Sequence, residues 1–373
     1  MMKKVLFTAT VDSHILAFHL PYLKYFKENG YEVHVATNGE QEIPYCDKKI
    51  KISFERSPFK LNNIRAIKAL KDVITEEKYD IIHTHTPMGS VVTRLAARKE
   101  RKKNNTRVMY TAHGFHFYKG APISYWLLFY PVEKYLSKYT DTLILINEED
   151  YSLAKRKFKK CKDIHYVPGV GIDKEKMSVS MTKKEKKDFR RSLGLKEEDF
   201  IMIYPAELSR RKNQKWLIET TEEIIKKHSN IHLLLPGKDS LNGELQELVK
   251  KLGLDQNIHF LGFRKDIPKL LQISDIAVSA SKQEGLPVNI LEAMFVSLPI
   301  IATDCRGNRD LIEDNVNGFI VKQLDHKTFT DKILILYSNK ERYQKMQEGS
   351  SEKINEYLLD NTMKYMKKIY RGE

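Results

Sequence analysis

The feature that most constrains this chain is a regular alternation of short apolar runs with longer amphipathic ones. In the first half, residues 3–10 (KKVLFTAT) predict a strand, residues 14–30 a helix that ends at Gly30, and residues 31–37 (YEVHVAT) the next strand. The same order continues to residue 147. Strands that alternate with helices of this length form a parallel sheet. Each helix carries the chain back to the end of the sheet at which the previous strand began, so the next strand runs in the same direction. The first half is therefore expected to be an α/β domain.

The second half repeats the alternation. Residues 182–195 (TKKEKKDFRRSLGL) predict a charged helix, and residues 200–208 (FIMIYPAEL) predict the strand that opens a second domain. Between the halves, PGVGID (168–173) lacks the third glycine and the following helix of a dinucleotide-binding fingerprint, so it fits a turn. A chain of 373 residues is long enough for two domains that each bury a core.

Composition excludes several classes of protein. No apolar run reaches the length of a membrane-spanning helix, and the start of the chain fits a first strand better than a signal peptide, so export is not expected. The three cysteines, Cys46, Cys161 and Cys305, are far apart and odd in number. They fit a reducing cytoplasm and neither a disulfide framework nor a zinc site.

The positive charge is concentrated in the first half. Residues 1–170 hold 29 Lys and Arg against 18 Asp and Glu, a net charge of +11, which leaves 35 against 31, or +4, for the rest. Such a surface could face nucleic acid, an anionic membrane or a polyanionic substrate, and a high lysine content can also have no functional meaning.

The most informative stretch is Ser281 to Glu313. Pro287 suits the first turn of a helix that runs to about residue 297, with Glu284 on the loop before it and Glu292 on its second turn. A helix start preceded by Gly285 attracts phosphate, and carboxylates there can accept hydrogen bonds from sugar hydroxyls. The arrangement predicts a sugar-nucleotide site. The alternative is that Glu284 and Glu292 are ordinary acidic residues near a helix start, without a ligand.

The stretch EGLPVNILEAM, followed by LPIIATD and RGNRDLI, resembles the E-x7-E region of retaining glycosyltransferases of family 4, which have the GT-B fold. The segments VDSHILAFHLPYLK, HTHTPMGS and YTAHGFHFYKGAP look like the exopolysaccharide and capsule members of that family. The resemblance covers nearly the whole chain. It implies two Rossmann-like domains that face each other across a cleft: an acceptor-side domain over 1–168, joined by a crossing helix over about 355–373, and a donor domain over 169–354.

The resemblance also assigns roles to residues. The implied catalytic residues are Glu284 and His113, beside the donor sugar, and Lys212, at the diphosphate. The implied donor-binding residues are Arg210, Arg211, Lys212, Gly237, Phe263, Arg264, Glu284, Gly285, Leu286 and Glu292, with Glu292 on the ribose. The candidates for the acceptor side are His14, His83 and His85. No HExxH motif or cysteine pair accompanies the histidines, so no metal and no cofactor is expected.

The chain departs from the family pattern at one position. The family usually has an Arg followed five residues later by a Lys, which matches Lys212, but Glu207 stands at the place of the Arg in this chain. Either Arg210 or Arg211 supplies the missing cation, or Lys212 and the helix start hold the diphosphate alone.

Residues 115–141 combine many aromatic side chains with lysines, and basic runs lie nearby at 98–107 and 154–162. The segment predicts either an amphipathic surface for anionic lipid, with Trp126 at headgroup level, or a helix packed on the core. We therefore expect the protein to be cytoplasmic and to bind as a peripheral protein to the inner face of the cell membrane.

The implied activity is transfer of a sugar from a nucleotide diphosphate, with UDP expected, to a hydroxyl of a lipid-linked saccharide in exopolysaccharide or capsule synthesis, with retention at the anomeric carbon. A sugar-nucleotide epimerase of the same architecture and a basic polyanion-binding protein are the alternatives. No nucleic-acid-binding motif is present, and no nucleic-acid partner is expected. The donor sugar and the acceptor cannot be read from these residues.

Overall fold

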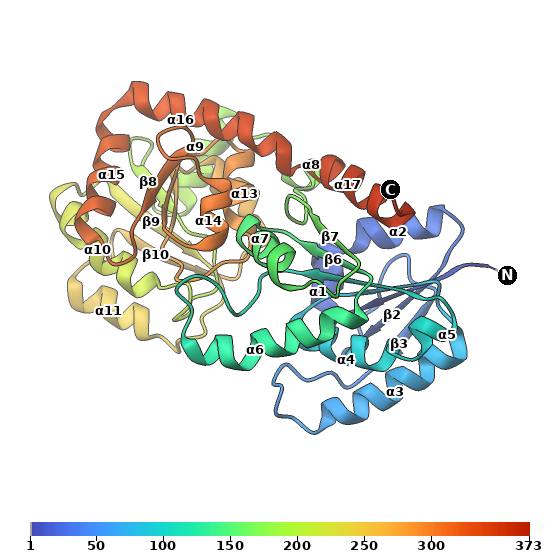
Figure 1. Ribbon diagram of the computed structural model, residues 1–373. Coiled ribbons are helices and arrows are strands. Elements are labelled where there is room, and N and C mark those ends of the chain that lie inside the picture. The colour runs from blue at the N-terminus through green and yellow to red at the C-terminus, as the bar shows by residue number, and fades with distance from the viewer. Residues whose placement is uncertain (1) are drawn as a thin grey trace. The chain divides into compact units, whose positions relative to one another are not determined.

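The computed structural model of the protein describes residues 2–373 and consists of two compact units (Figure 1). The first unit is Met1–Val170 together with Met363–Glu373, and the second is Gly171–Thr362. Each unit contains one parallel sheet. No helix among residues 2–373 is long and apolar enough to span a membrane.

The sheet of the first unit has the strand order β3-β2-β1-β4-β5-β6-β7, with every pair parallel. Its strands are β1 (Lys4–Thr8), β2 (Glu32–Thr37), β3 (Lys48–Lys51), β4 (Ile81–Thr84), β5 (Arg107–Ala112), β6 (Thr142–Leu145) and β7 (Asp163–Tyr166). Its helices are α1 (Asp12–Phe18), α2 (Leu20–Glu28), α3 (Asn62–Glu77), α4 (Pro87–Ala97), α5 (Glu100–Lys103), α6 (Ile123–Leu136) and α7 (Glu148–Lys157), with a 3₁₀ turn at Ser137–Tyr139.

Both faces of this sheet are buried, which explains the nearly continuous apolar runs of its strands. Because strand side chains alternate, Val5 and Phe7 pack on one face against Phe26 of α2, whereas Leu6 packs on the other against Leu70 of α3. The last helix, α17 (Leu359–Arg371), joins the first of these faces through a group of side chains that comprises Met366, Ile369 and Tyr370.

The sheet of the second unit has the order β10-β9-β8-β11-β12-β13, again with parallel pairs. Its strands are β8 (Phe200–Ile203), β9 (Ile231–Pro236), β10 (Ile258–Gly262), β11 (Ile276–Ser279), β12 (Ile300–Thr303) and β13 (Gly318–Val321). Its helices are α8 (Lys174–Met177), α9 (Lys183–Ser192), α10 (Gln214–Lys227), α11 (Glu244–Leu252), α12 (Ile267–Gln272), α13 (Val288–Phe295), α14 (Arg306–Leu311), α15 (His326–Ser338) and α16 (Lys340–Lys353), with a 3₁₀ turn at Ile354–Tyr357.

The α/β class and the two Rossmann-like parallel sheets predicted from the sequence are confirmed. The single helix predicted over residues 14–30 is wrong in one respect, because it is divided at His19 into α1 and α2. Pro21 lies in the first turn of α2, where its missing N–H costs nothing, and it could not continue α1. The short strands β3 and β7 were not predicted. β3 is a lysine-rich edge strand, and β7 lies at the other edge of the sheet.

Candidate active site

In both sheets the strand order reverses once, and ligands in open α/β sheets bind at the carboxyl ends of strands at such a reversal. The reversal lies between β8 and β11 in the second unit and between β1 and β4 in the first. The chain after β8 leads to Lys212, and the chain after β11 leads to Glu284. In the first unit, the corresponding segments carry His14 after β1 and His85 after β4.

Lys212 and Glu284 meet at the reversal point of the second sheet. The Lys212 Nζ lies 2.5 Å from Oε1 of Glu284, and both side chains are almost buried. Arg211 adds a second cation, with Nη1 3.3 Å from Oε2 of Glu284. Burial alone would raise the pKa of Glu284, but the charges of Lys212 and Arg211 outweigh it and lower the pKa of this carboxyl below its usual value.

Two buried hydroxyl groups hold this pair in place. Ser281 donates a 2.5 Å hydrogen bond to Oε1 of Glu284, and Tyr204 lies 2.7 Å from the Ser281 hydroxyl. The Tyr204 hydroxyl is also 3.0 Å from the carbonyl oxygen of Lys212. The ends of β8 and β11 are thereby linked through side chains as well as through the sheet.

The loop after Glu284 is closely packed against the start of α14. A Cβ atom at Gly307 would lie 2.5 Å from the carbonyl oxygen of Gly285, so only glycine fits there. Arg306 donates from Nε to the carbonyl oxygen of Glu284 at 3.2 Å. Leu286 is buried, and α13 follows with the free N–H groups that every helix start presents. This rigid start suits an anionic ligand.

Glu292 lies on the second turn of α13 and is half-buried. Its carboxylate makes no hydrogen bond or ion pair with another side chain or with the backbone among residues 2–373. Burial raises the pKa of Glu292 to about 7. A carboxylate without a partner in such surroundings is a candidate for binding hydroxyl groups of a ligand.

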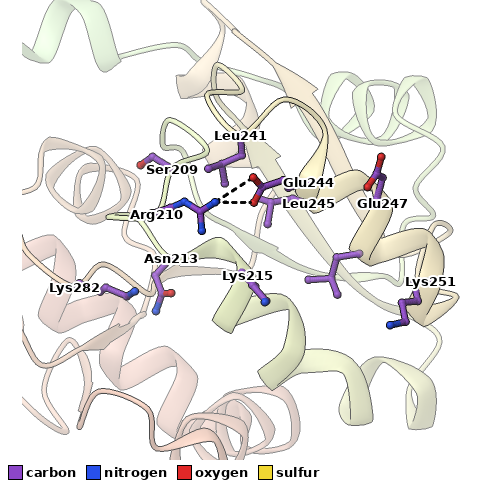
Figure 2. Close-up of a pocket in the computed structure, with 11 residues that line it drawn as sticks. Ser209, Arg210, Asn213, Lys215, Leu241, Glu244, Leu245, Glu247, Lys251 and Lys282 are labelled. Atoms are coloured by element: carbon purple, nitrogen blue, oxygen red, sulfur yellow. Dashed lines mark hydrogen bonds and ion pairs between the residues drawn. The ribbon is translucent and has the colours of Figure 1, made fainter.

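Arg210 takes no part in the group around Lys212. It forms an ion pair with Glu244 of α11, with Nη2 3.1 Å from Oε1 of Glu244 (Figure 2). Both side chains line a cavity of about 380 Å³ between the segment that follows β8 and helix α11. Of the two arginines proposed from the sequence to replace the cation missing at Glu207, the structure brings Arg211 to Glu284. Glu207 itself accepts a hydrogen bond from Ser240.

The other donor-side candidates lie at neighbouring strand ends. Gly237 follows β9, and a Cβ atom there would lie 1.8 Å from the carbonyl oxygen of Ala206, so glycine lets the ends of β8 and β9 approach. Phe263 follows β10 and is 75% exposed. Arg264 is held by Asp266 in a bidentate pair at 2.7 and 2.6 Å.

The histidine candidates gather in the first unit. His14 and His113 have their Nε2 atoms 3.3 Å apart, and His85 and His19 stack with ring centroids 3.6 Å apart. His14 also lines a cavity of about 410 Å³ with Thr10, Phe18, Arg56 and Thr86 among its walls. His83 lies beside His85, with ring centroids 4.2 Å apart, but both of its nitrogens have partners, Tyr370 at 2.9 Å and Thr111 at 2.8 Å.

Comparison with known proteins identifies the family. Residues 4–147 match the family model described as glycosyl transferase 4-like, and residues 185–353 match the model described as glycosyl transferases group 1. The putative glycosyltransferase EpsD of Bacillus subtilis (strain 168) is 45% identical over 370 residues, which cover 99% of this chain and 97% of that protein. The chain is a group 1 glycosyltransferase.

One further relative of this glycosyltransferase and one solved structure of similar fold are informative. The UDP-Gal:alpha-D-GlcNAc-diphosphoundecaprenol alpha-1,3-galactosyltransferase of Escherichia coli is 29% identical over 306 residues, which cover 79% of this chain and 77% of that protein. The crystal structure of Anabaena HepE in complex with UDP and glucose covers 100% of both chains with a TM-score of 0.81 at 17% identity. The likeness to HepE shows a shared fold, in agreement with the GT-B type.

Three side chains that contact the candidate residues were not predicted from the sequence: Tyr204, Ser281 and His19. Tyr204 directly follows β8, and Ser281 lies two residues after the end of β11. A position just after a buried strand was the signal that could have indicated side chains at a binding site. His19 was overlooked because residues 14–30 were expected to form one helix. Pro21 was the signal for a helix start at that point.

Proposed function

We propose that this glycosyltransferase transfers a sugar from a UDP-sugar to a hydroxyl of a saccharide carried on a lipid diphosphate, with retention at the anomeric carbon. The observation that carries the proposal is the Lys212–Glu284 pair beside the start of α13. A cation, free N–H groups and an oriented carboxylate are the groups needed to hold a diphosphate joined to a sugar. The names of the Escherichia coli relative and of the HepE complex support UDP, and the former supports the lipid diphosphate.

In this proposal the second unit binds the donor. The diphosphate lies at Gly285, Leu286 and the start of α13, and Lys212 turns from Glu284 toward it. Glu284 then accepts hydrogen bonds from hydroxyls of the donor sugar, and Glu292 accepts those of the ribose. Arg211 balances the remaining charge in place of the arginine absent at Glu207.

The chemical step breaks the bond between the anomeric carbon and the diphosphate oxygen. The electron pair leaves with the diphosphate, and Lys212 and the helix start stabilise the charge that develops, without a divalent cation at the diphosphate. The acceptor oxygen attacks from the same face, and its proton passes to the departing phosphate oxygen. The products are UDP and a glycoside of unchanged anomeric configuration.

The first unit is proposed to bring the acceptor from the inner face of the cytoplasmic membrane, as in exopolysaccharide or capsule synthesis. Helix α6 carries a row of exposed apolar side chains, with Ile123 73% and Leu127 72% exposed. Its opposite side is fixed by a buried ion pair of Glu133 with Arg94 at 2.9 Å. A rigid helix with an apolar outer face on a basic unit matches an anionic membrane surface.

One side chain does not take the place expected for it on this helix. Trp126 is half-buried and packs against Phe117, and its indole N–H donates to the carbonyl oxygen of Tyr118 at 3.2 Å. The membrane anchors of α6 are therefore Leu127 and its exposed neighbours.

The test supplies purified protein with several UDP-sugars and a short-chain lipid diphosphate saccharide. UDP should be released only when the acceptor is present, and the product should keep the donor's anomeric configuration in its proton NMR coupling. Conversion of the UDP-sugar without an acceptor would instead indicate an epimerase, and an inverted product would exclude the front-face route.

A further inference from the structure

Four histidines of the first unit converge although they come from three separate segments. His14 and His19 belong to the α1–α2 segment, His85 follows β4, and His113 follows β5. One ring nitrogen of each can be chosen so that all four lie within 4.8 Å of one another. We call these residues the histidine cluster.

Two members of the histidine cluster are fully buried without hydrogen-bond partners. His19 and His85 are at most 1% exposed, and neither ring nitrogen of either residue has a hydrogen-bond partner. Buried polar groups are paired in the great majority of cases, and an unpaired one costs about 1–3 kcal/mol. The fold can satisfy a histidine at this place, because His83 on β4 has partners for both nitrogens. The nitrogens of His19 and His85 therefore call for a partner that protein atoms do not supply.

We propose that the histidine cluster binds one divalent transition-metal ion of the zinc type. In tetrahedral zinc sites the Zn–N distance of about 2.0–2.1 Å places neighbouring ligand nitrogens about 3.3–3.4 Å apart. The Nε2 atoms of His14 and His113 are 3.3 Å apart, a distance at which the two rings form a hydrogen bond when no ion lies between them. An ion between them and the stacked pair would give one nitrogen each of His19 and His85 a partner.

The chemistry of the donor set agrees with this ion. Neutral imidazole is the form of histidine that binds metal, and burial lowers the pKa of all four rings, so they are uncharged near neutral pH. Imidazole ligands suit zinc, copper, cobalt and nickel rather than magnesium or calcium. The absence of HExxH or paired cysteines excludes local motifs only. It does not exclude ligands that the fold assembles from distant segments.

A metal here would have a positional role. The ion would fix the α1–α2 break to the ends of β4 and β5, and it would orient His14 at the wall of the 410 Å³ cavity. It would use His113 as a ligand, in place of the role beside the donor sugar that the family resemblance implies for this residue. It would leave the proposed stabilisation of the diphosphate by Lys212 in the second unit unchanged.

The test uses full-length protein without a polyhistidine tag, stripped with a chelator and titrated with zinc chloride or cobalt chloride. One zinc per chain should bind by atomic emission, and cobalt should give the intense visible absorption of a tetrahedral site. His85→Gln should weaken zinc binding by at least about tenfold. The matched control is His83→Gln, since His83 is a buried histidine on β4, two positions before His85, and this variant should keep the full stoichiometry.

Circular dichroism establishes whether each variant is folded. If His85→Gln does not fold, His14→Gln, which is less buried, carries the same expectation. The proposal is overturned if the wild-type protein binds no zinc, or if both folded variants keep its affinity. Loss of zinc in His34→Gln alone would also overturn it, because the ion would then belong to the separate group of Glu32, His34 and Glu77.

Discussion

The Lys212 ammonium and the Glu284 carboxylate form an ion pair that joins the segments after β8 and β11, 72 positions apart in the chain. Both groups are nearly buried, so a ligand that binds either of them must replace its present partner. In the proposed function, a diphosphate that binds Lys212 removes this partner from Glu284, whose carboxylate can then turn to the sugar. Donor binding and sugar orientation would be coupled through this ion pair.

Replacing Lys212 by Ala should raise the barrier to transfer by about 2–4 kcal/mol, the usual effect of losing one group that stabilises developing charge. The measurement is kcat/KM for UDP release in the presence of acceptor. Lys215→Ala is the matched control, since Lys215 is an exposed lysine three positions along on α10. Near-wild-type turnover of a folded Lys212→Ala variant would remove this residue from the site.

The two neighbouring arginines should differ. Arg211→Ala should lower kcat/KM by roughly three- to tenfold because Arg211 contacts Glu284, whereas Arg210→Ala should leave it within about twofold because Arg210 pairs with Glu244. The same assay compares both variants side by side. The opposite order would place the replacement cation at Arg210.

Glu292→Gln should stabilise the protein at about pH 8 and not at about pH 5. The pKa of Glu292 is raised from 4.5 to about 7, so the folded state favours the protonated carboxyl, and this group lowers stability as pH rises from about 4.5 to 7. Removing the charge should regain at most about 3 kcal/mol, measured as a Tm higher by several degrees at about pH 8. Equal Tm values for both proteins at both pH values would contradict the burial of this carboxylate.

Glu292→Gln should also weaken the binding of UDP, measured by calorimetry, because the amide of Gln cannot replace the carboxylate as an acceptor for two ribose hydroxyls. Glu284→Gln should mainly slow transfer and leave UDP affinity closer to that of the wild-type protein. Similar losses of UDP affinity in both variants would refute this division between ribose and sugar.

Binding to vesicles should require anionic lipid and weaken as salt rises, because exposed charges are screened. The double variant Ile123→Ser/Leu127→Ser should bind several-fold more weakly in a flotation assay, since it removes two exposed apolar side chains from α6. Leu324→Ser is the matched control, as Leu324 is 68% exposed in the second unit. If wild-type protein ignores anionic vesicles at low salt, the membrane surface is not the partner of α6.

The sequence allowed much of the fold to be predicted, because the alternation of apolar strands and amphipathic helices is a local pattern. The break at His19 was not predicted, because the apolar residues keep a helical spacing across it and Pro21 alone interrupts the helix. The strand β3 was not predicted, because it lies at the edge of the sheet and three of its four residues are lysines. At the site, the positions of Lys212 and Glu284 follow from their places after strands, and that of Glu292 follows from its spacing along the helix that begins near Pro287. The choice between Arg210 and Arg211 depends on Glu244 of a distant helix, which no local pattern indicates.

The last helix of the chain has a consequence for how the protein is made. Residues 363–373 complete the apolar layer that also contains Phe7 and Phe26, yet they are translated after all of residues 171–362. At about 5–20 residues per second, the ribosome needs roughly 10–40 s to produce that intervening segment. During this time the N-terminal unit lacks Met366, Ile369 and Tyr370, so one face of its sheet is covered only in part, by α2. Its folding is completed only after residues 363–373 have been made, so a truncation that removes these residues should destabilise the N-terminal unit.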